Sequence, residues 1–479
     1  MRTTPAPAAR LLGALLAAGA LAGCAADRIT ALNAPTVSNY TPVTTRAQVQ
    51  QLATGVADAD RQNYATQVVI FSIVGRDLYR IDASEPRWAS VLLDQRTPDN
   101  SGFVGGALWT DAYQPITAAT FLIRGAGATS VLSAAEKSAV TGYAQTMQGL
   151  SYLSLVRSRD TLGIPVQAVV DSLVPIRCKP AALAYVSALL DSGATALAAA
   201  GATAFPFALP PGFSSNGAFT TPAAFLQFNR GLKGIVEMYR GMLPLEQAGD
   251  PLAAPDAARM AAALAAFDSS FYAVPTGAAS LGAGVYYTFG TASGETANPL
   301  ANTTVFRANP SVVAEAEPGD PRFAAKVDTS NTAPISITIN EDTVQSRYGV
   351  RYPRSATDPL ALLKNSELVL SRAQVLWTLG RDAEALALVN AVRQANGLAP
   401  KTAADFASRL DLLIGGILHE KRYELLFESP TRWVDFRNMG MLARAGLEFP
   451  NAGGRAPFPA LPIPNNEATS RNGNIACQP

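Results

Sequence analysis

The sequence NSELVLSRAQVLWTLGRDAEALALVNAVRQANG (Asn365–Gly397) decides the fold, because its apolar residues recur at helical spacing in two successive runs. In the first run, Val369, Ala373 and Leu376 lie at i, i+4 and i+7, and other apolar residues fill the adjacent face. A helix that is apolar on nearly all sides must be buried. The second run ends at Asn396-Gly397, which is a typical helix stop.

A tight break at Leu379–Asp382 separates the two runs and predicts two antiparallel helices. The sequence LGRDAEAL at this break is similar to the turn sequence of a tetratricopeptide hairpin. A third helix is expected to open at the capping box Thr402-x-x-Asp405 and to run through Gly415-Gly416 to Leu425. Each glycine costs about 1 kcal/mol relative to alanine in a helix, so the pair suggests a close helix approach.

The third helix ends in a dense run of acids, arginines and aromatics, HEKRYELLFESPTRWVDFRNMG (His419–Gly440). This run resembles the closing motif of the SusD/RagB family of outer-membrane nutrient-binding lipoproteins. The motif positions are Glu420, Arg422, Glu424, Glu428, Arg432, Trp433, Asp435 and Arg437. The resemblance implies a mainly α protein, in which tetratricopeptide-like hairpins form a scaffold that carries a loop-rich face and a few short strands.

Further segments extend the resemblance over nearly the full length. They are Trp109-x-x-x-Tyr113-x-x-Ile116, the helix exit LVRSRDTLGIPV (Leu155–Val166), the turn Gly319–Arg322 and the closing segment Pro462–Glu467. One departure is Gln374, which stands where the first hairpin helix of the family often has glutamate.

The N-terminus has the pattern of a lipoprotein signal. A basic start precedes a short apolar run, Leu11–Ala20, and the residues before Cys24 form a bacterial lipobox, LAGC. We therefore expect residues 1–23 to be a signal peptide and Cys24 to be acylated, for example with palmitate; an ordinary signal with a coincidental cysteine is the alternative. Residues 24–44 are expected to be a tether and residues 45–479 a single α-helical domain.

The charge balance argues against a nucleic-acid partner. The chain has 38 Lys and Arg against 37 Asp and Glu, and no block of basic residues occurs. No second long apolar run is evident after the signal. Cys178 and Cys477 remain after lipidation, and because they lie far apart in the sequence we expect free thiols rather than a disulfide, although either state is possible.

Several helices are expected in the first half of the chain. Residues 45–63 carry an apolar face, Ser133-x-x-Glu136 is a capping box, and Pro180 starts another helix. Thr221-Pro222 caps the clearest amphipathic pattern, and the alanine-rich residues 256–269 are its expected partner. Residues 276–358 are instead rich in Gly, Ser, Thr, Asn and Pro, with short strands at Val285–Thr291 and Ile335–Asn340. So long a loop-rich segment suggests a binding surface.

The residues that usually carry catalysis or hold cofactors are scarce. His419 is the only histidine, which excludes a zinc site built on paired histidines, and no G-x-S-x-G, P-loop or dinucleotide motif occurs. Glu420, Glu424 and Glu428 share one helix face, as the paired carboxylates of a glycosidase would. The neighbouring cations favour structural salt bridges instead. We therefore expect no enzyme activity, no cofactor and no metal.

Aromatic residues in the loop-rich regions are the candidates for ligand contact, because rings capture the C–H faces of sugars and peptides. The candidates are Trp88, Tyr286, Tyr287 and Phe289, whereas Trp109, Trp377 and Trp433 are expected in the core. Packing of any one ring beneath its own loop is the competing interpretation.

The family resemblance implies a lipid-anchored protein at the outer-membrane surface that binds an oligosaccharide or peptide and delivers it to a SusC-like TonB-dependent transporter. Two alternatives stay open. One is a helical-repeat adaptor that binds another protein, and the other is a glycoside hydrolase that uses two carboxylates, Glu424 and Glu428.

Overall fold

The computed structural model describes residues 43–93, 100–167, 173–293, 295–301, 304–331, 333–339, 342–442 and 457–479. Val43–Pro479 form one compact unit. The predicted signal peptide, the acylation site Cys24 and nearly all of the predicted tether lie outside the described residues.

Helices dominate this unit, as the sequence predicts. The long helices are α2 (Arg46–Val74), α4 (Ala107–Ala128), α5 (Ala134–Arg159), α6 (Lys179–Ala199), α7 (Pro222–Ala248), α8 (Ala257–Asp268), α12 (Asn365–Thr378) and α13 (Asp382–Ala395). The short helices are α3 (Arg87–Ser90), α9 (Ala278–Leu281), α10 (Pro310–Ala314), α11 (Pro321–Lys326), α14 (Arg409–Asp411), α15 (His419–Leu425), α16 (Arg432–Asn438) and α17 (Asn465–Ser470). The 3-10 and π segments are η3 (Gly102–Gly106), η4 (Asp160–Leu162), η5 (Pro211–Phe213), η6 (Pro299–Ala301), η7 (Ala403–Asp405) and η8 (Leu412–Leu418).

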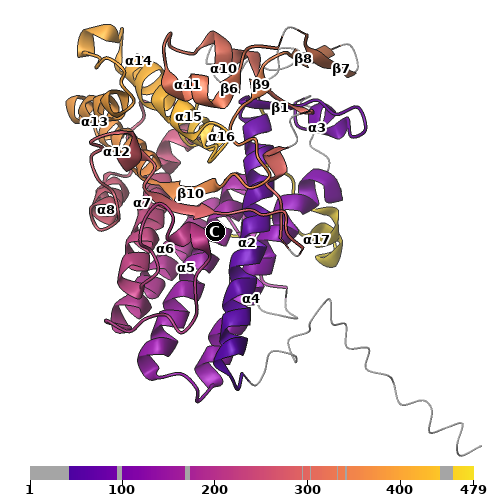
Figure 1. Ribbon diagram of the computed structural model, residues 1–479, viewed down its shortest axis with the longest axis vertical. Helices are drawn as coiled ribbons and strands as arrows, with labels where there is room; N and C mark the ends of the chain where they lie inside the picture. Colours follow the sequence, from indigo (N-terminus) through magenta and orange to yellow (C-terminus); the bar gives the residue numbers. More distant parts are fainter. Residues whose placement is uncertain are drawn as a thin grey trace, which may run out of the picture. The chain divides into compact units, whose positions relative to one another are not determined.

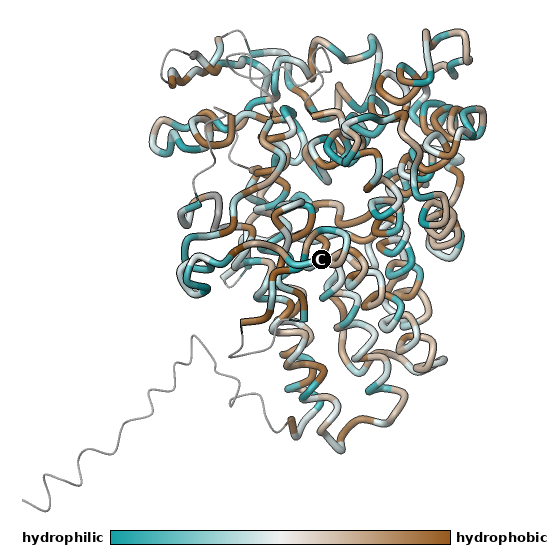
Figure 2. Tube along the Cα trace, turned by 180° about the vertical axis from the view of Figure 1, so that it is seen from behind, coloured by the Kyte–Doolittle hydropathy of each residue, from teal (hydrophilic) through white to brown (hydrophobic). Residues whose placement is uncertain are grey.

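The long helices pair into successive hairpins that stack on one another. Helix α2 packs on α4, α4 on α5, α5 on α6, α6 on α7, α7 on α8, α8 on α12 and α12 on α13. Helices α2 and α4–α7 run side by side, and α12–α15 lie beyond one end of them (Figure 1). Hydrophobic and hydrophilic residues alternate along several of these helices (Figure 2), as expected where a helix buries one face and exposes the other.

Local sequence signals set several helix starts. Thr45 and Ser133 form capping boxes with Gln48 and Glu136, and Thr221 caps α7 with Pro222 at the first helical position. The predicted helices at Ser133, Pro180 and Thr221 and the hairpin α12–α13 are therefore confirmed. Helix α2 continues beyond the predicted end at Asn63, to Val74, because its second half is buried on almost every side.

Short strands connect the helical scaffold to the loop-rich segment. The strands are β1 (Leu78–Arg80), β2 (Ile164–Pro165), β3 (Ile176–Arg177), β4 (Gly284–Tyr287), β5 (Phe306–Ala308), β6 (Val327–Asp328), β7 (Ile335–Ile339), β8 (Asp342–Ser346), β9 (Gly349–Val350) and β10 (Leu360–Lys364). They form a four-stranded sheet of order β1-β5-β9-β6 and the pairs β10-β4, β2-β3 and β7-β8. The first sheet joins β1, near the start of the chain, to strands of the loop-rich segment.

Two predictions about the C-terminal third are wrong. The capping box Thr402–Asp405 opens only the 3-10 turn η7, and the next helix starts at Arg409. Gly415 and Gly416 lie within the π-helix η8 rather than in a continuous α-helix. A Cβ at Gly416 would lie 3.2 Å from the Phe406 ring. This glycine therefore allows a close contact, as predicted, but the contact is with a ring that precedes the helix in sequence and not with another helix.

Cys178 and Cys477 form a disulfide, which corrects the expectation of free thiols. Their Cα atoms are 4.9 Å apart although 299 positions separate them in the sequence. The fold brings them together because the C-terminal tail runs parallel to β3, with a bridge between Arg177 and Gln478. Sequence separation alone was a poor guide to this pairing.

Helix α6 is long and apolar enough to cross a membrane by length and composition, a run that the sequence pattern did not single out. In this structure it packs against α5 and α7 and belongs to the helical scaffold. Buried residues such as Leu183, Val186 and Leu190 form its inner face.

The contact between α5 and α6 depends on a glycine. A Cβ on Gly142 would lie 2.5 Å from Leu197 Cγ, 2.8 Å from the Leu197 backbone nitrogen and 2.9 Å from the Gly193 carbonyl oxygen. Gly142→Ala is therefore expected to destabilise the protein by about 1–3 kcal/mol, because α6 must move away. Urea denaturation, followed by circular dichroism, measures the change.

The matched control is Gly55→Ala in α2, where a Cβ would meet nothing within 4 Å. This variant should be neutral or gain up to about 1 kcal/mol from helix propensity. Equal effects of the two alanines would contradict the proposed close approach.

Candidate binding surface

The motif predicted from the sequence lies in α15, α16 and the short connection between them, and it is buried. Its charged members are at most 7 % exposed, and Trp433 is fully buried. These residues are Glu420, Arg422, Glu424, Glu428, Arg432, Trp433, Asp435 and Arg437. Charged side chains are rarely buried unless they are paired, so the partners of this motif determine its role.

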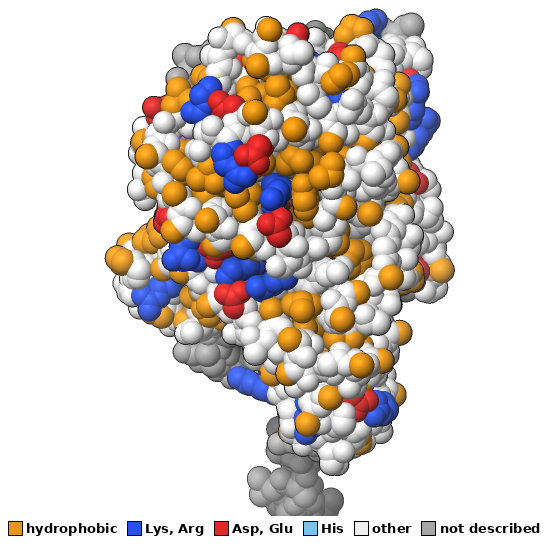
Figure 3. Space-filling model, turned by 90° about the vertical axis from the view of Figure 1, so that its left-hand side faces the viewer, with side chains coloured by type: hydrophobic (Ala, Val, Ile, Leu, Met, Phe, Trp, Pro, Cys, Tyr) orange, Lys and Arg blue, Asp and Glu red, His pale blue; other side chains and the backbone are white. Residues whose placement is uncertain are grey.

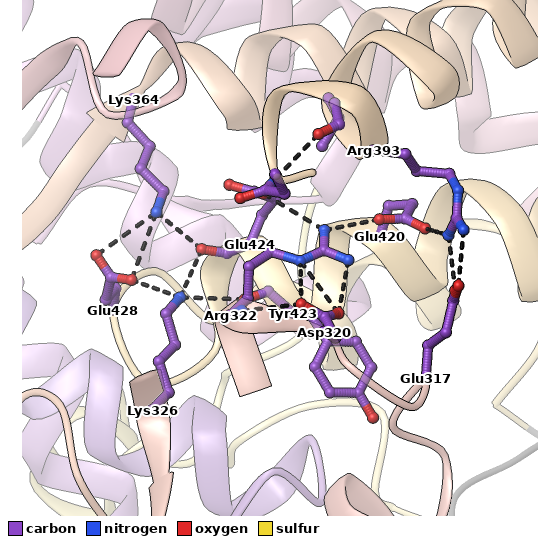
Figure 4. A network of polar contacts seen from close by, with 12 residues as sticks. Glu317, Asp320, Arg322, Lys326, Lys364, Arg393, Glu420, Tyr423, Glu424 and Glu428 are labelled. Atoms are coloured by element: carbon purple, nitrogen blue, oxygen red, sulfur yellow. Dashed lines mark hydrogen bonds and ion pairs between the residues drawn. The ribbon is translucent and has the colours of Figure 1, made fainter. Parts of the chain in front are cut away.

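Glu428 pairs with two lysines, one within the loop-rich segment and one just after it. Lys326 Nζ of α11 lies 2.5 Å from Glu428 Oε1, and Lys364 Nζ at the end of β10 lies 3.4 Å from it (Figure 4). Both lysines also donate to the Glu424 carbonyl oxygen at 2.8 Å. Burial alone would raise the pKa of Glu428, but the two lysines outweigh it and hold the pKa below its usual value.

Glu420 is held between two arginines. Its carboxylate lies 2.6 Å from Arg393 Nη1 of α13 and 2.7 Å from Arg322 Nη1 of α11. Arg393 also binds Glu317, and Arg322 also binds Asp320 (Figure 4). The predicted turn at Gly319–Arg322 is thereby fixed against α13 and α15.

Glu424 accepts a hydrogen bond of 2.5 Å from Asn396 Nδ2 and lies 3.4 Å from Arg322 Nη1. Asn396 terminates α13, so this contact joins the end of the hairpin to α15. The carboxylate is therefore occupied within the protein interior.

Two further arginines of the motif reach the first half of the chain. Arg422 lies 2.8 Å from Asp77, next to β1, and 2.5 Å from Glu315. Arg437 lies 2.8 Å from Asp160 at the end of α5. These ion pairs tie α15 and α16 to both halves of the fold.

Asp435 pairs with Lys421 at 3.0 Å, and Lys421 also donates to Gln374 at 3.1 Å. Gln374, the noted departure from the family pattern, thus acts as a neutral acceptor for a buried lysine. Trp433 donates from its indole nitrogen to the Phe458 carbonyl oxygen at 2.9 Å, and Trp109, Trp377 and Trp433 are buried as predicted.

This arrangement does not suit glycoside hydrolysis. A hydrolase of this kind needs two carboxylates that flank an open cleft, one of them protonated. Here Glu424 and Glu428 are 5 % and 6 % exposed and contact internal donors, and the pKa of Glu428 is lowered rather than raised. The two candidate carboxylates of the hydrolase hypothesis therefore lack the geometry for that reaction.

A metal site at the motif is also a poor fit. Within the described residues, Glu317, His419 and Glu420 place donor atoms within 4.8 Å of one another. However, Arg393 Nη1 lies 2.8 Å from Glu317 and 2.6 Å from Glu420, so a guanidinium already bridges the two carboxylates. Burial and nearby cations lower the pKa of His419 to about 4, and its ring lies 4.8 Å from the Tyr423 ring.

A cavity at the motif is too small for a nutrient. It has a volume of about 10 Å³, which is room for roughly one water molecule, and its walls include Asp77, Lys421, Arg422, Thr431 and Arg432. Ligand contact must therefore be sought away from this cavity.

Three of the four predicted ligand-binding aromatics lie in the interior. Tyr286, Tyr287 and Phe289 are 5 %, 1 % and 7 % exposed. Tyr287 donates to Asp60 at 2.5 Å, and burial raises the pKa of that carboxyl to about 6 despite this bond. Tyr286 donates to the Gly282 carbonyl oxygen. Strand β4, which carries Tyr286 and Tyr287, is covered on both faces, and Phe289 follows it, so these three rings expose little surface to a ligand in this structure.

Trp88 is different, because it is partly exposed and belongs to a stack of rings and guanidinium groups. Arg80 lies over Trp88 at 4.3 Å and over Phe306 at 5.6 Å, and Arg87 lies over Phe103 at 4.3 Å. The Trp88 and Phe103 rings meet edge to face, with centroids 5.0 Å apart. We call these five residues, Arg80, Arg87, Trp88, Phe103 and Phe306, the arginine–aromatic stack.

Four elements build the arginine–aromatic stack. Arg80 of β1 stands directly opposite Phe306 of β5, Trp88 and Arg87 start α3, and Phe103 comes from η3. Asp82 and Glu85 bind the two arginines at 3.0 Å and 2.5 Å and so orient them. The sequence pattern indicated Trp88 but not Arg80 and Phe103, because only strand pairing and the turn of η3 bring these two residues to Trp88.

Comparison with solved structures identifies the fold. The chain is similar to NanU from B. fragilis, with a TM-score of 0.63 and 14 % identity over 92 % of this chain and 98 % of that one. It is also similar to surface glycan-binding protein A from Bacteroides uniformis, with a TM-score of 0.65 and 14 % identity over 90 % and 98 %. A SusD superfamily protein from Bacteroides vulgatus matches with a TM-score of 0.61 and 14 % identity over 91 % and 99 %.

The chain has a SusD-like fold. The resemblance inferred from the motif is thus confirmed in three dimensions, and so is the mainly helical fold class. No protein-family model matches the sequence, and no curated protein matches it either. At this low identity, the similarity lies in the fold rather than in the overall sequence.

The paired charges of the SusD-like motif make a prediction about stability. Glu428→Gln leaves Lys326 and Lys364 without their buried counter-charge, so we expect a loss of about 3–5 kcal/mol at pH 7 in urea denaturation. The pKa of Glu428 is lower in the folded protein than in the unfolded chain, where it is near 4.3. Ionised Glu428 therefore stabilises the fold fully above the unfolded pKa, and this stabilisation is lost as the pH falls through the folded pKa. The difference between variant and wild type should therefore shrink in acid.

Glu384→Gln is the control, since Glu384 forms an exposed ion pair with Arg381 on α13. Its denaturation midpoint should match that of the wild type. A Glu428→Gln variant as stable as this control would show that the buried network is dispensable.

Proposed function

We propose that the protein is a lipid-anchored receptor at the outer-membrane surface, which binds a nutrient glycan and passes it to a TonB-dependent, SusC-like transporter. Three observations support this proposal. They are the SusD-like fold, the lipobox ending at Cys24, and the partly exposed arginine–aromatic stack. One of the similar structures is named a surface glycan-binding protein, which favours a glycan over a peptide as the ligand.

The observation that carries the proposal is the geometry around Trp88. Its indole and the Phe103 ring offer apolar surface for the C–H face of a sugar, while Arg80 and Arg87 offer hydrogen-bond donors for hydroxyl groups. Asp82 and Glu85 fix both arginines before any ligand binds, so little side-chain entropy is lost on binding.

The same structure supports a role in binding without bond breaking. The carboxylates of the closing motif are engaged in internal ion pairs, and the arginine–aromatic stack holds its own acids, Asp82 and Glu85, in salt bridges. The pKa of Asp82 is lowered, first by its hydrogen bond from Ser84, so this group is not a proton donor at neutral pH. We therefore assign capture, not catalysis, to this surface.

A protein partner, rather than nucleic acid, fits the surface charge. On the face seen in Figure 3, acidic and basic side chains lie near one another among hydrophobic ones. Ion pairs of described residues such as Arg372 with Asp268 and Arg409 with Asp382 show the same mixing. We propose that helical faces of the scaffold contact the transporter.

Replacement of Trp88 tests ligand capture. A glycan array first selects an oligosaccharide that the wild type binds, and isothermal titration calorimetry then compares variants. We expect Trp88→Ala to weaken binding roughly tenfold, about 1.4 kcal/mol, because the stacking surface is lost. Leu252→Ala, which alters a 52 % exposed side chain outside the arginine–aromatic stack, should bind like the wild type. Equal affinity of Trp88→Ala and wild type would place the ligand elsewhere.

Purification from the source membrane tests delivery. The full chain with a C-terminal affinity tag should co-purify with a barrel transporter from detergent-solubilised outer membranes. Cys24→Ala should lose membrane attachment, which fractionation and the mass of the mature N-terminus would show. Recovery of the protein without a transporter, or of a wild-type N-terminus without acyl chains, would overturn this part of the proposal.

A further inference from the structure

The C-terminal segment from Pro457 onward contacts several elements that are distant from it in the sequence. The Leu461 amide donates to the Ser158 carbonyl oxygen at the end of α5, and the Asn465 amide donates to the Asn100 carbonyl oxygen at 3.0 Å. Helix α17 then packs against η3, the element that carries Phe103 of the arginine–aromatic stack. We call residues 457–479 the C-terminal strap.

The far end of the C-terminal strap is fixed as an added strand. The Gln478 amide donates to the Ile176 carbonyl oxygen at 2.8 Å, and the Cys178 amide donates to the Gln478 carbonyl oxygen at 2.8 Å. Arg177 Nη1 donates to the Pro479 carbonyl oxygen at 3.1 Å. The tail thereby extends the β2–β3 pair by one short strand.

The disulfide Cys178–Cys477 closes this attachment covalently. Without it, the strand addition consists of few hydrogen bonds, and most of the residues from Asn472 to Pro479 are exposed. A short exposed strand that few hydrogen bonds hold opens readily. Both cysteines are only partly buried, so a dithiol in solution can reach them.

We propose that the disulfide is a redox-sensitive latch that holds the C-terminal strap against η3 and so positions Phe103 in the arginine–aromatic stack. In the opening step, a dithiol reductant transfers two electrons and two protons to the disulfide. The S–S bond breaks, Cys178 and Cys477 become thiols, and the dithiol becomes a cyclic disulfide. The strap then frays from Pro479 back through α17, which loosens η3 and Phe103. The effect on ligand binding rests on the proposed function, whereas the link between the disulfide and η3 does not.

Hydrogen–deuterium exchange of the full chain, measured by mass spectrometry with and without the dithiol dithiothreitol, tests this proposal without any ligand. On reduction we expect about tenfold faster exchange in peptides that cover residues 465–479 and in peptides that cover η3. Peptides from α12 and α13, which pack on each other and on α15 and η8, should keep their rates. The variant Cys178→Ser/Cys477→Ser should reproduce the reduced pattern in the absence of reductant.

A second readout follows Trp88 directly. Trp109, Trp377 and Trp433 are buried, so Trp88 is the tryptophan that a soluble quencher reaches most easily. Reduction should increase acrylamide quenching in the wild type but not in Trp88→Phe. Faster exchange confined to residues 475–479, with η3 and Trp88 quenching unchanged, would overturn the latch, as would no change at all. Failure of glycan binding in the oxidised wild type would instead contradict only the proposed function.

Discussion

The fold depends on charges that are buried in pairs around α15 and α16. Removing such groups from water costs several kcal/mol per ion, and only a close counter-charge offsets that cost. Glu420, Glu428 and Arg422 each meet partners from more than one segment, so a single side chain joins elements that are distant in the sequence. The helical hairpins bury the apolar surface, while this network fixes how the loop-rich segment sits on them.

A surface that captures a solute needs rigid support, and the network supplies it. Arg422 holds Asp77 immediately before β1, and β1 carries Arg80 into the arginine–aromatic stack. The same strand pairs with β5, which supplies Phe306. The residues of the closing motif are buried and do not contact a ligand themselves. Their role is to position the elements that carry the arginine–aromatic stack.

Local signals in the sequence predicted local structure well. The capping box at Ser133, the break at Gly380 and the spacing in α12 depend on residues a few positions apart, and each predicted element is present. The closing motif indicated the fold because its acids and bases have fixed partners. The residues that contact a ligand were harder to predict. Tyr286 and Tyr287 follow Val285 in a short apolar run, which is typical of a strand buried on both faces. The loop-like composition of the surrounding sequence obscured this pattern. Contacts that depend on the tertiary fold, such as Arg80 with Trp88 or Cys178 with Cys477, cannot be predicted from the spacing of residues along the sequence.

The most direct test of the central role of the buried network is a double-mutant cycle between Lys326 in α11 and Glu428 in the motif. Lys326→Met, Glu428→Leu and the double variant are compared with the wild type by urea denaturation at pH 7. The account predicts that the double variant is more stable than the sum of the single effects implies, with a coupling of about 2–3 kcal/mol. Additive effects, with a coupling near zero, would contradict it, because the two charges would then not support each other across the fold.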